Sequence, residues 1–319
     1  MNRLFLRIDG YGFLNLVWGT LKWCWILLLR NFSKSRYIQR KVYNFNMILD
    51  VFDRGLSKQL LKYGARELDH KYILDEVVHE GDFILDIGAN IGYYALIERK
   101  LIGDDGFLIA IEPSPENVKL LRKNLKLNKF DNTEVYEGAI SSTTSKKEFF
   151  LSNESNLNTF HDYGTVEKHL SGETILVDTY TIPELLRKSD ISQSLDLIRM
   201  DVEGHEVDVI NGMIEEIERN VLMPSIIFET HISRYNNENN MSATLSKLFQ
   251  LGYKTKFVGS SWQEGTKIIE DLGYKPIKSI PTDGVRRSIF SDISPEHTIK
   301  LVCETGGVRT VYLEAQKFN

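Results

Sequence analysis

An apolar run that ends in a glycine-rich turn constrains the fold of this 319-residue chain more than any other feature. Residues 83–87 read FILDI, and Gly88 and Gly92 follow with Asn90 between them. A short apolar run stopped by glycine is typical of a buried parallel strand. Glycine lets the backbone turn sharply and approach a ligand, and the helix predicted over residues 93–100 would point its free amides at that ligand. The sequence therefore predicts a binding site where this strand ends.

Apolar strands and amphipathic helices alternate along the rest of the chain. A helix is predicted over residues 115–128, because Pro115 suits a helix start and Val118, Leu121 and Leu125 share one face. This alternation favours an α/β fold with a doubly wound, mostly parallel sheet. We expect helical structure over residues 43–80, a loop or hairpin over 141–164 and a loop-rich surface tract over 259–283. Strands are expected at residues 106–113, 133–140, 173–181, 195–200, 224–231, 253–258, 287–291 and 298–304.

An acidic residue follows the glycine turn at a spacing that suits a nucleoside. Glu112 stands twenty residues after Gly92, at the end of the second predicted strand. A carboxylate at that place can accept hydrogen bonds from ribose hydroxyls. The turn is not the G-x-G-x-x-G dinucleotide fingerprint, because Asn90 occupies its middle position and Asp86 precedes the first glycine by two residues. The combination favours an adenosine-type cofactor over the alternative in which Asp86 caps a turn and Glu112 is merely solvated.

Short motifs in a fixed order carry a family resemblance over roughly residues 72–232, about half of the chain. They are DIGANIG (86–92), IEPSPEN (111–117), KLN (126–128), EGAIS (137–141), VDTYTI (177–182), IRMDVEGHE (198–206) and IIFETH (226–231). The set resembles the FkbM-type S-adenosylmethionine-dependent methyltransferases. The resemblance implies a class I, Rossmann-like methyltransferase fold with a seven-stranded sheet containing one antiparallel strand. It also implies methyl transfer from S-adenosylmethionine, typically to a hydroxyl oxygen of a small molecule, sugar or glycan.

The resemblance implies roles for individual residues as well. Arg199 departs from the family pattern, which more often has lysine there, so a specific ammonium contact is not carried over. The implied cofactor residues are Asp86, Gly88, Asn90 and Gly92 for the amino-acid portion, Glu112 for the ribose and the turn at Ala139 for the adenine.

Two later strands end in residues suited to proton transfer. Asp201 and Glu203 follow strand 195–200, and strand 225–229 ends at Glu229 with His231 just beyond. Neighbouring parallel strands would bring these residues to the edge that holds the cofactor. Methyl transfer to oxygen needs an aligned hydroxyl and removal of its proton. We expect Asp201 or Glu229 to be the base or to orient the acceptor, with Glu203 and His231 as second choices. Glu203 would otherwise be a helix N-terminal charge. No metal is expected, with an Asp201–Glu229–His231 cation site as the less favoured alternative.

Charge divides the chain into two parts. Residues 1–62 carry eleven basic and three acidic residues, a net charge of +8, whereas the remainder carries −13. The apolar stretch 13–29 precedes a basic flank, and a helix docked on the body is the favoured interpretation, with association of residues 13–41 with an anionic membrane surface, or a membrane span, as the alternatives. We therefore predict a basic, helical N-terminal extension over residues 1–70 and a methyltransferase domain over residues 71–319. The domain would lie in the cytoplasm, in keeping with two distant cysteines.

Other classes of protein fit the sequence less well. The acidic body lacks the basic surface that nucleic-acid binding requires. A nicotinamide-dependent oxidoreductase on a similar sheet is the main alternative, and the missing dinucleotide fingerprint disfavours it. A non-catalytic protein that only binds S-adenosylmethionine is a second alternative. Residues 201–204 lack the Pro-Pro-aromatic motif of amino-methylating enzymes, which favours oxygen as the acceptor atom.

Overall fold

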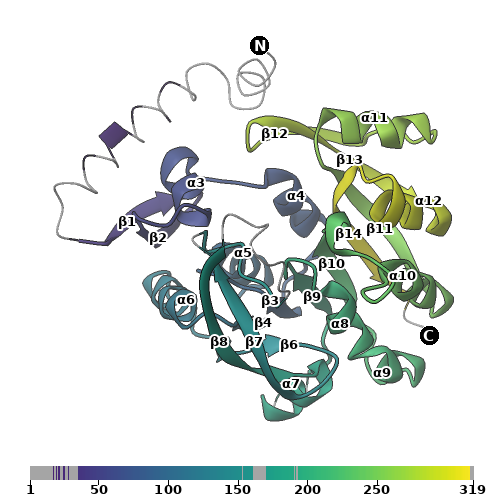
Figure 1. The fold of residues 1–319 in the computed structure, drawn as a ribbon, viewed down its shortest axis with the longest axis horizontal. Coiled ribbons are helices and arrows are strands. Elements are labelled where there is room, and N and C mark those ends of the chain that lie inside the picture. Colours follow the sequence, from purple (N-terminus) through teal and green to yellow (C-terminus); the bar gives the residue numbers. More distant parts are fainter. Residues whose placement is uncertain are drawn as a thin grey trace.

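The computed structural model describes residues 35–152, 154–160, 170–189, 191 and 193–316, together with residues 17, 19, 21, 24, 25 and 28. It has an α/β architecture in which helices cover both faces of one large sheet (Figure 1). The sheet has nine strands in the order β12-β13-β11-β14-β10-β9-β3-β4-β5. The prediction of a class I methyltransferase fold is confirmed, and the sheet is two strands wider than expected.

The parallel half of the sheet forms from the apolar runs that the sequence predicted. The strands β3, β4, β5, β9 and β10 pair in parallel, and β14 lies antiparallel between β10 and β11. The strands β13 and β12 extend the sheet beyond β11 as an antiparallel pair. The nine strands are β3 (Phe83–Ile87), β4 (Phe107–Glu112), β5 (Thr133–Glu137), β9 (Leu197–Met200), β10 (Ser225–Glu229), β11 (Tyr253–Ser260), β12 (Lys278–Thr282), β13 (Val285–Ile293) and β14 (Val308–Ala315).

Two hydrophobic clusters lie on opposite faces of this sheet. In β3, Phe83, Leu85 and Ile87 belong to one cluster and Ile84 to the other, as the two-residue period of a strand requires. The helices on the Ile84 face are α3 (Leu56–Tyr63), α4 (Leu68–Val77), α5 (Tyr93–Ile102) and α6 (Pro115–Leu127). The other cluster includes residues of α7 (Ile182–Lys188), α8 (Glu206–Asn211), α9 (Ile214–Glu218), α10 (Met241–Gln250) and α11 (Gln263–Asp271).

The expectation of helix over residues 43–80 is wrong at its start. Residues 37–50 form an antiparallel hairpin of β1 (Tyr37–Val42) and β2 (Phe45–Asp50). Phe45, Met47 and Leu49 are buried at alternate positions, which is a strand period. The main-chain N–H of Ile48 donates to the side chain of Asn124 in α6 at 2.7 Å. The hairpin is therefore fixed to the domain rather than part of a separate helical extension.

The expected strand at residues 298–304 is also wrong. Residues 295–304 form α12 (Pro295–Ile299) and the π-helical turn η3 (Lys300–Glu304), and the last strand, β14, comes later. The hydroxyl of Ser294 accepts a hydrogen bond from the N–H of His297, and Pro295 occupies the first turn. These are helix-start signals. Leu301 and Val302 are buried three and four positions after the buried Thr298, as on one face of a helix.

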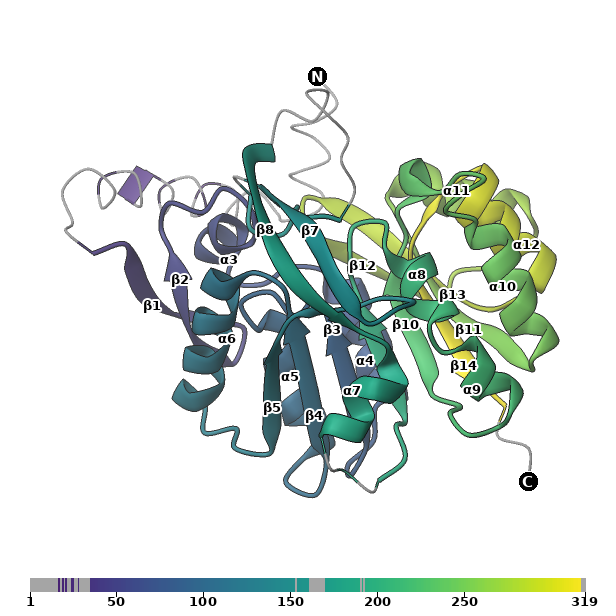
Figure 2. The same ribbon diagram turned by 60° about the horizontal axis from the view of Figure 1, so that its bottom comes forward.

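A small second sheet lies beyond β5. It consists of β6 (Ala139–Ile140), β8 (Leu170–Tyr180) and β7 (Ser145–Ser152) in that order. The long strands β7 and β8 cross in front of the main sheet in both views (Figure 2). The irregular stretch expected at 141–164 therefore contains one strand of a hairpin. This places Phe149 of β7, and the segment 154–160 that follows it, near the glycine turn.

Most of the N-terminal stretch 13–29, whose sequence suggested a membrane association, lies outside the described residues. Within the part of the chain that the structure describes, no helix is both long and apolar enough to cross a membrane.

Candidate functional site

A cleft of about 790 Å³, open to solvent, lies at the carboxyl ends of β3, β4 and β9. The sheet order reverses here, since β3 is followed in space by β4 on one side and by β9 on the other. Ligands of doubly wound sheets bind at such a point. Of the ten residues that the sequence singled out, six line the cleft: Gly88, Asn90, Glu112, Ala139, Asp201 and Glu203.

The glycine turn has a backbone that few other residues could adopt. Gly88, Asn90 and Gly92 all have positive φ, at 77°, 50° and 91°. A Cβ atom on Gly88 would lie 2.3 Å from the carbonyl oxygen of Asp201, so the glycine allows β3 and β9 to end side by side. The N–H groups of Gly88 and Ala89 both donate to the carbonyl of Ile111, at 3.0 and 3.2 Å. The start of α5 is thereby held at the floor of the cleft.

Glu112 lies where a ribose-binding acid is expected, and it is already partly engaged. Its Oε1 accepts hydrogen bonds from Ser114 N and Asn117 Nδ2, and its Oε2 accepts one from Asn90 N, each at 3.0 Å. A carboxylate offers about four lone-pair sites, so one site on Oε2 is available to a hydroxyl. Burial raises the pKa of Glu112 to about 7, even though these donors favour the charged form.

The wall beside Glu112 is apolar, as an adenine ring requires. Ala139 lies there with Ile111, Ile140 and Phe149, and all four side chains are buried. Ala139 begins β6, just after β5. An apolar wall at this place suits the adenine contact that the family resemblance implies, and that contact stays a prediction.

Asp86 lies beneath the cleft rather than on its surface. It is fully buried, and its Oδ1 accepts a hydrogen bond from Arg199 Nη1 at 3.1 Å. Burial raises the pKa of Asp86, and the charge of Arg199 opposes that shift. Arg199 also lies 4.2 Å from the ring centre of Tyr94 and reaches Asp201 Oδ2 at 3.4 Å. The expected direct contact of Asp86 with the cofactor is thus replaced by a buried ion pair that joins β3 to β9.

Gly92 also lies away from the cleft lining. It precedes α5, and a Cβ atom there would lie 2.7 Å from a methyl carbon of Leu121 in α6. Its role is to let α5 and α6 approach each other, which positions the glycine turn indirectly.

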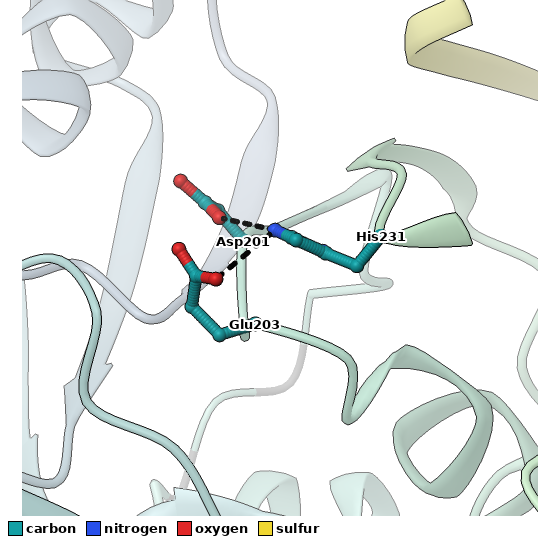
Figure 3. A group of neighbouring side chains, drawn as sticks. All are labelled: Asp201, Glu203 and His231. Carbon is teal, nitrogen blue, oxygen red and sulfur yellow. Dashed lines mark ion pairs between the residues drawn. The ribbon is translucent and has the colours of Figure 1, made fainter. Parts of the chain in front are cut away.

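Asp201 and Glu203 line the part of the cleft where a methyl acceptor is expected, the acceptor end, and His231 lies beside them (Figure 3). His231 Nε2 lies 3.5 Å from Glu203 Oε2 and 3.9 Å from Asp201 Oδ1. Its other nitrogen, Nδ1, lies 2.8 Å from Oε1 of the fully buried Glu206. His231 itself is absent from the cleft lining, and its ring faces the carboxylates of Asp201 and Glu203, which do line the cleft.

The charges of these groups influence one another strongly. Burial raises the pKa of Glu203 to about 8, against the opposing charge of His231. Burial lowers the pKa of His231, but the charges of Glu206, Glu203 and Glu229 and the hydrogen bond to Glu206 together outweigh it and raise that pKa to about 10. Burial raises the pKa of Asp201, but the charges of Arg199, His231, Arg309 and Arg66 together more than offset it, so this pKa is lowered. Such opposed shifts within one cluster are typical of functional sites.

Glu229, one of the two preferred bases, lies outside the cleft lining. Both of its oxygens are bound by Arg309, with N–O distances of 2.8 and 2.9 Å. A carboxylate held in this way is poorly suited to take a proton from an acceptor. Glu229 therefore pairs with Arg309 near the start of β14.

Several lining residues were not anticipated from the sequence. Arg66, Glu67, Ser155 and Phe160 come from segments outside the strand–turn pattern, whereas Tyr94 and His205 stand close in sequence to the glycine turn and to Glu203. The carbonyl of Ser155 accepts hydrogen bonds from the side-chain amides of Asn90 at 3.0 Å and Asn117 at 3.3 Å. Ser155 N and Oγ in turn donate to Asp53, each at 3.0 Å. The polar composition of residues 152–158 was the only sequence signal for this segment.

Comparison with known proteins identifies the class of this domain. Residues 86–255, just over half of the chain, match the Methyltransferase FkbM domain, so the chain belongs to the FkbM methyltransferase family. This confirms the family predicted from the motifs, and with it S-adenosylmethionine as the family's cofactor.

Individual relatives are distant or cover little of the chain. Protein-L-isoaspartate O-methyltransferase 2 from Archaeoglobus fulgidus is 38% identical over 61 residues, which is 19% of this chain and 28% of the relative. Methyltransferase 1 from Beauveria bassiana is 21% identical over 151 residues, 43% of this chain and 60% of that protein. The chain thus matches less than two thirds of the length of these relatives. The solved structure of M. jannaschii TYW2 in complex with AdoMet is 14% identical, with a TM-score of 0.41 over 89% of both chains.

Proposed function

We propose that this protein transfers a methyl group from S-adenosylmethionine to a hydroxyl oxygen of a small molecule, sugar or glycan. The observation that carries the proposal is the position of Asp201 and Glu203, which line the same cleft as the glycine turn and Glu112. A carboxylate pair next to a methyl donor suits removal of a hydroxyl proton. The sequence that follows β9 also lacks the motif of amino-methylating enzymes.

In this proposal the cofactor extends along the cleft from the glycine turn to β6. Its amino-acid portion lies against Gly88, Asn90 and the first turn of α5, where main-chain N–H groups favour a carboxylate. Its ribose donates a hydrogen bond to Glu112, and its adenine packs near Ala139. The sulfonium and its methyl group then face Asp201 and Glu203.

The reaction needs one proton acceptor and one in-line displacement. The hydroxyl proton passes to the Asp201–Glu203–His231 cluster as the oxygen forms a bond to the methyl carbon. The carbon–sulfur bond breaks, its electron pair remains on sulfur, and S-adenosylhomocysteine leaves as a neutral thioether. The methyl donor is already activated, so alignment and proton removal are the main tasks of the protein.

Calorimetric titration with S-adenosylhomocysteine and with NAD⁺ and NADH tests the cofactor assignment. We expect the first to bind and the nicotinamides not to bind. Binding of a nicotinamide alone would overturn the proposal. Transfer from methyl-labelled S-adenosylmethionine to a panel of hydroxylated sugars and lipid-linked glycans then distinguishes an enzyme from a protein that only binds the cofactor.

We further propose that the basic N-terminal segment 13–41 brings the domain to an anionic membrane surface, with the domain in the cytoplasm. A variant that begins at residue 35 keeps the β1–β2 hairpin, which starts at Tyr37 and packs on α6. The full chain is expected to sediment with phosphatidylserine-containing vesicles, and the shortened variant is not. Equal sedimentation of the two would contradict the proposal.

A further inference from the structure

Three possible ligand atoms at the acceptor end lie close enough together to bind one metal ion after small side-chain movements. His231 Nε2, one oxygen of Asp201 and one oxygen of Glu203 all lie within 4.8 Å of one another. Metal–ligand bonds of about 2.0–2.2 Å place neighbouring ligand atoms roughly 3 Å apart. The observed separations of 3.5 and 3.9 Å from the histidine nitrogen need to shorten by less than 1 Å. Small side-chain rotations are enough for that.

The histidine ring is held in the orientation that a metal ligand requires. Its Nδ1 faces Glu206, whose side chain is fully buried, at 2.8 Å. Glu206 is itself fixed by the N–H of Gly204 at 3.2 Å and the hydroxyl of Tyr235 at 3.3 Å. An imidazole that donates from Nδ1 to a carboxylate presents its lone pair at Nε2, as in carboxylate–histidine–metal arrangements. That lone pair points between Asp201 and Glu203 (Figure 3).

The backbone that carries Glu203 is also unusual. Glu203 has a φ of 51°, a left-handed conformation that costs a non-glycine residue free energy. Its carbonyl accepts a hydrogen bond from Thr159 at 3.4 Å, and Asn239 donates to the carbonyl of the next residue, Gly204, at 2.8 Å. The surroundings therefore maintain a strained residue whose side chain is turned toward His231. A solvated helix-start charge would not need this conformation.

The charge balance favours a cation in this position. Arg309 is engaged by Glu229, and Arg199 divides its contacts between Asp86 and Asp201. Within the described part of the chain, the ion pairs of Asp201, Glu203 and Glu206 involve only the shared charge of Arg199 and the ring of His231. Metal binding would displace the protons that His231 and Glu203 otherwise hold, and the divalent ion would then offset the negative charge of Asp201, Glu203 and Glu206.

We propose that Asp201, Glu203 and His231 bind a first-row divalent cation, with Mn²⁺ better suited than Mg²⁺ or Ca²⁺. Imidazole is a poor ligand for the two harder ions, and two carboxylates with one imidazole suit Mn²⁺ well. The set differs from the alternative considered from the sequence, because Glu203 takes the place of Glu229.

The cation would also define the class of acceptor, an inference that depends on the proposed methyltransferase function. Asp201 and Glu203 line the cleft, so the open coordination positions of the ion face the methyl donor. An acceptor with two adjacent oxygens, such as a vicinal diol or a hydroxy-carbonyl compound, would bind through both. With the cation bound, Asp201, Glu203 and His231 would act as its ligands rather than as the base. The ion would lower the pKa of the bound hydroxyl, whose proton would pass to solvent, and the oxygen would bond to the methyl carbon as the carbon–sulfur bond breaks and sulfur keeps the electron pair.

Electron paramagnetic resonance of Mn²⁺ tests the site on the full chain after chelator treatment. The wild-type protein is expected to remove the sharp signal of one equivalent of free Mn²⁺. His231→Ala and Glu203→Gln are expected to lose this binding, whereas the matched control Glu229→Gln keeps it. Glu206→Gln is expected to weaken Mn²⁺ binding roughly 10- to 100-fold, because a neutral amide replaces the charged partner of the ring.

The outcomes separate the two proposals. All proteins are titrated with S-adenosylhomocysteine, so a variant that binds this ligand normally is folded at the cleft. Normal ligand binding without Mn²⁺ binding by the wild type, or equal Mn²⁺ binding by His231→Ala, overturns the cation site alone. Failure of the wild type to bind S-adenosylhomocysteine overturns the proposed function.

Catechol and phenol then test the class of acceptor with S-adenosylhomocysteine present. Catechol is expected to change the spectrum of bound Mn²⁺, and phenol is not. If catechol leaves the spectrum unchanged, the chelating acceptor is wrong.

Discussion

The cofactor end of the cleft is built from backbone, whereas the acceptor end is built from side chains that separate segments bring together. At the cofactor end, a continuous turn with positive φ at Gly88, Asn90 and Gly92 sets the geometry. At the acceptor end, Asp201 and Glu203 follow β9, and His231 follows β10 about thirty residues later. The first kind of site is encoded locally. The second depends on how strands, helix starts and ion pairs fit together, and this difference determines which substitutions each end tolerates.

The largest effect is expected for Gly88→Ala at the cofactor end. The new Cβ would meet the Asp201 carbonyl at 2.3 Å, and alanine disfavours a φ of 77°. Strain and overpacking together should lower the free energy of unfolding by about 2–4 kcal/mol. Chemical denaturation measures the loss, and affinity for S-adenosylhomocysteine should fall roughly 100-fold.

Gly64→Ala is the matched control for this substitution. Gly64 has nearly the same φ, 78°, but none of the described atoms lies within 4 Å of the position that a Cβ would take there. It should cost only about 1–2 kcal/mol, from backbone strain alone, and leave ligand affinity unchanged. Equal destabilisation by the two changes would show that the close approach of β3 and β9 is unimportant.

The second-largest effect is expected for Glu203→Gln at the acceptor end. This substitution keeps the size of the side chain and removes its ability to take a proton, so kcat should fall about 100-fold. Affinity for S-adenosylhomocysteine should stay within about twofold, because the cofactor half is untouched. Glu229→Gln, at the same edge but bound to Arg309, should lower kcat by no more than about threefold. The reverse ranking of the two variants in a methyl-transfer assay would restore Glu229 as the base.

The sequence predicted the cofactor end better than the acceptor end for a physical reason. The run 83–87, the glycine turn and Glu112 are short-range signals, and each lies where it was expected. The choice between Glu203 and Glu229 depended on Arg309, which lies eighty residues beyond Glu229 and pairs with it through β14. No local pattern reports such a contact.

The secondary structure differs from expectation in three places. One is the tract 259–283, expected to be loop-rich, which contains α11 and β12. The other two errors have local causes. The hairpin at residues 37–50 was missed because its basic residues suggested an exposed helix, although buried residues alternate in β2. At residues 298–304 the alternation of apolar and polar residues indicated a strand, whereas Ser294 and Pro295 are the start signal of the helix that forms there. In both cases the decisive information was the period of the buried positions.

A smaller effect, about five- to tenfold between pH 6 and 8, is expected from the titration of Glu112. Burial raises its pKa to about 7, and only its charged form accepts a hydrogen bond fully at Oε2. Affinity for S-adenosylhomocysteine should therefore increase as the pH rises through 7. Calorimetry at several pH values measures the change, and Glu112→Gln should remove it.

The stability of the unliganded protein should change in the opposite direction. The folded-state pKa of Glu112 lies above its ordinary value of 4.5, so the folded state binds the extra proton between these values. The contribution of this group to stability is present in full below about pH 4.5 and is lost as the pH rises through about 7. The difference in stability between the wild type and Glu112→Gln isolates this contribution. A difference that does not vary with pH would contradict the raised pKa.

The smallest effect is expected at Ser155, in the segment that follows β7 and contacts the glycine turn. Ser155 Oγ donates to Asp53 at 3.0 Å, while the Ser155 carbonyl accepts from Asn90 in the glycine turn. Ser155→Ala removes one hydrogen bond worth about 1 kcal/mol and keeps the main-chain contacts. The dissociation rate of S-adenosylhomocysteine in stopped-flow measurements should rise about two- to fivefold. Ser171→Ala removes a similar bond to Leu151, far along β8, and should leave that rate unchanged. If both serines change the rate equally, segment 154–160 does not help to retain the cofactor, and the cofactor end depends on its own backbone alone.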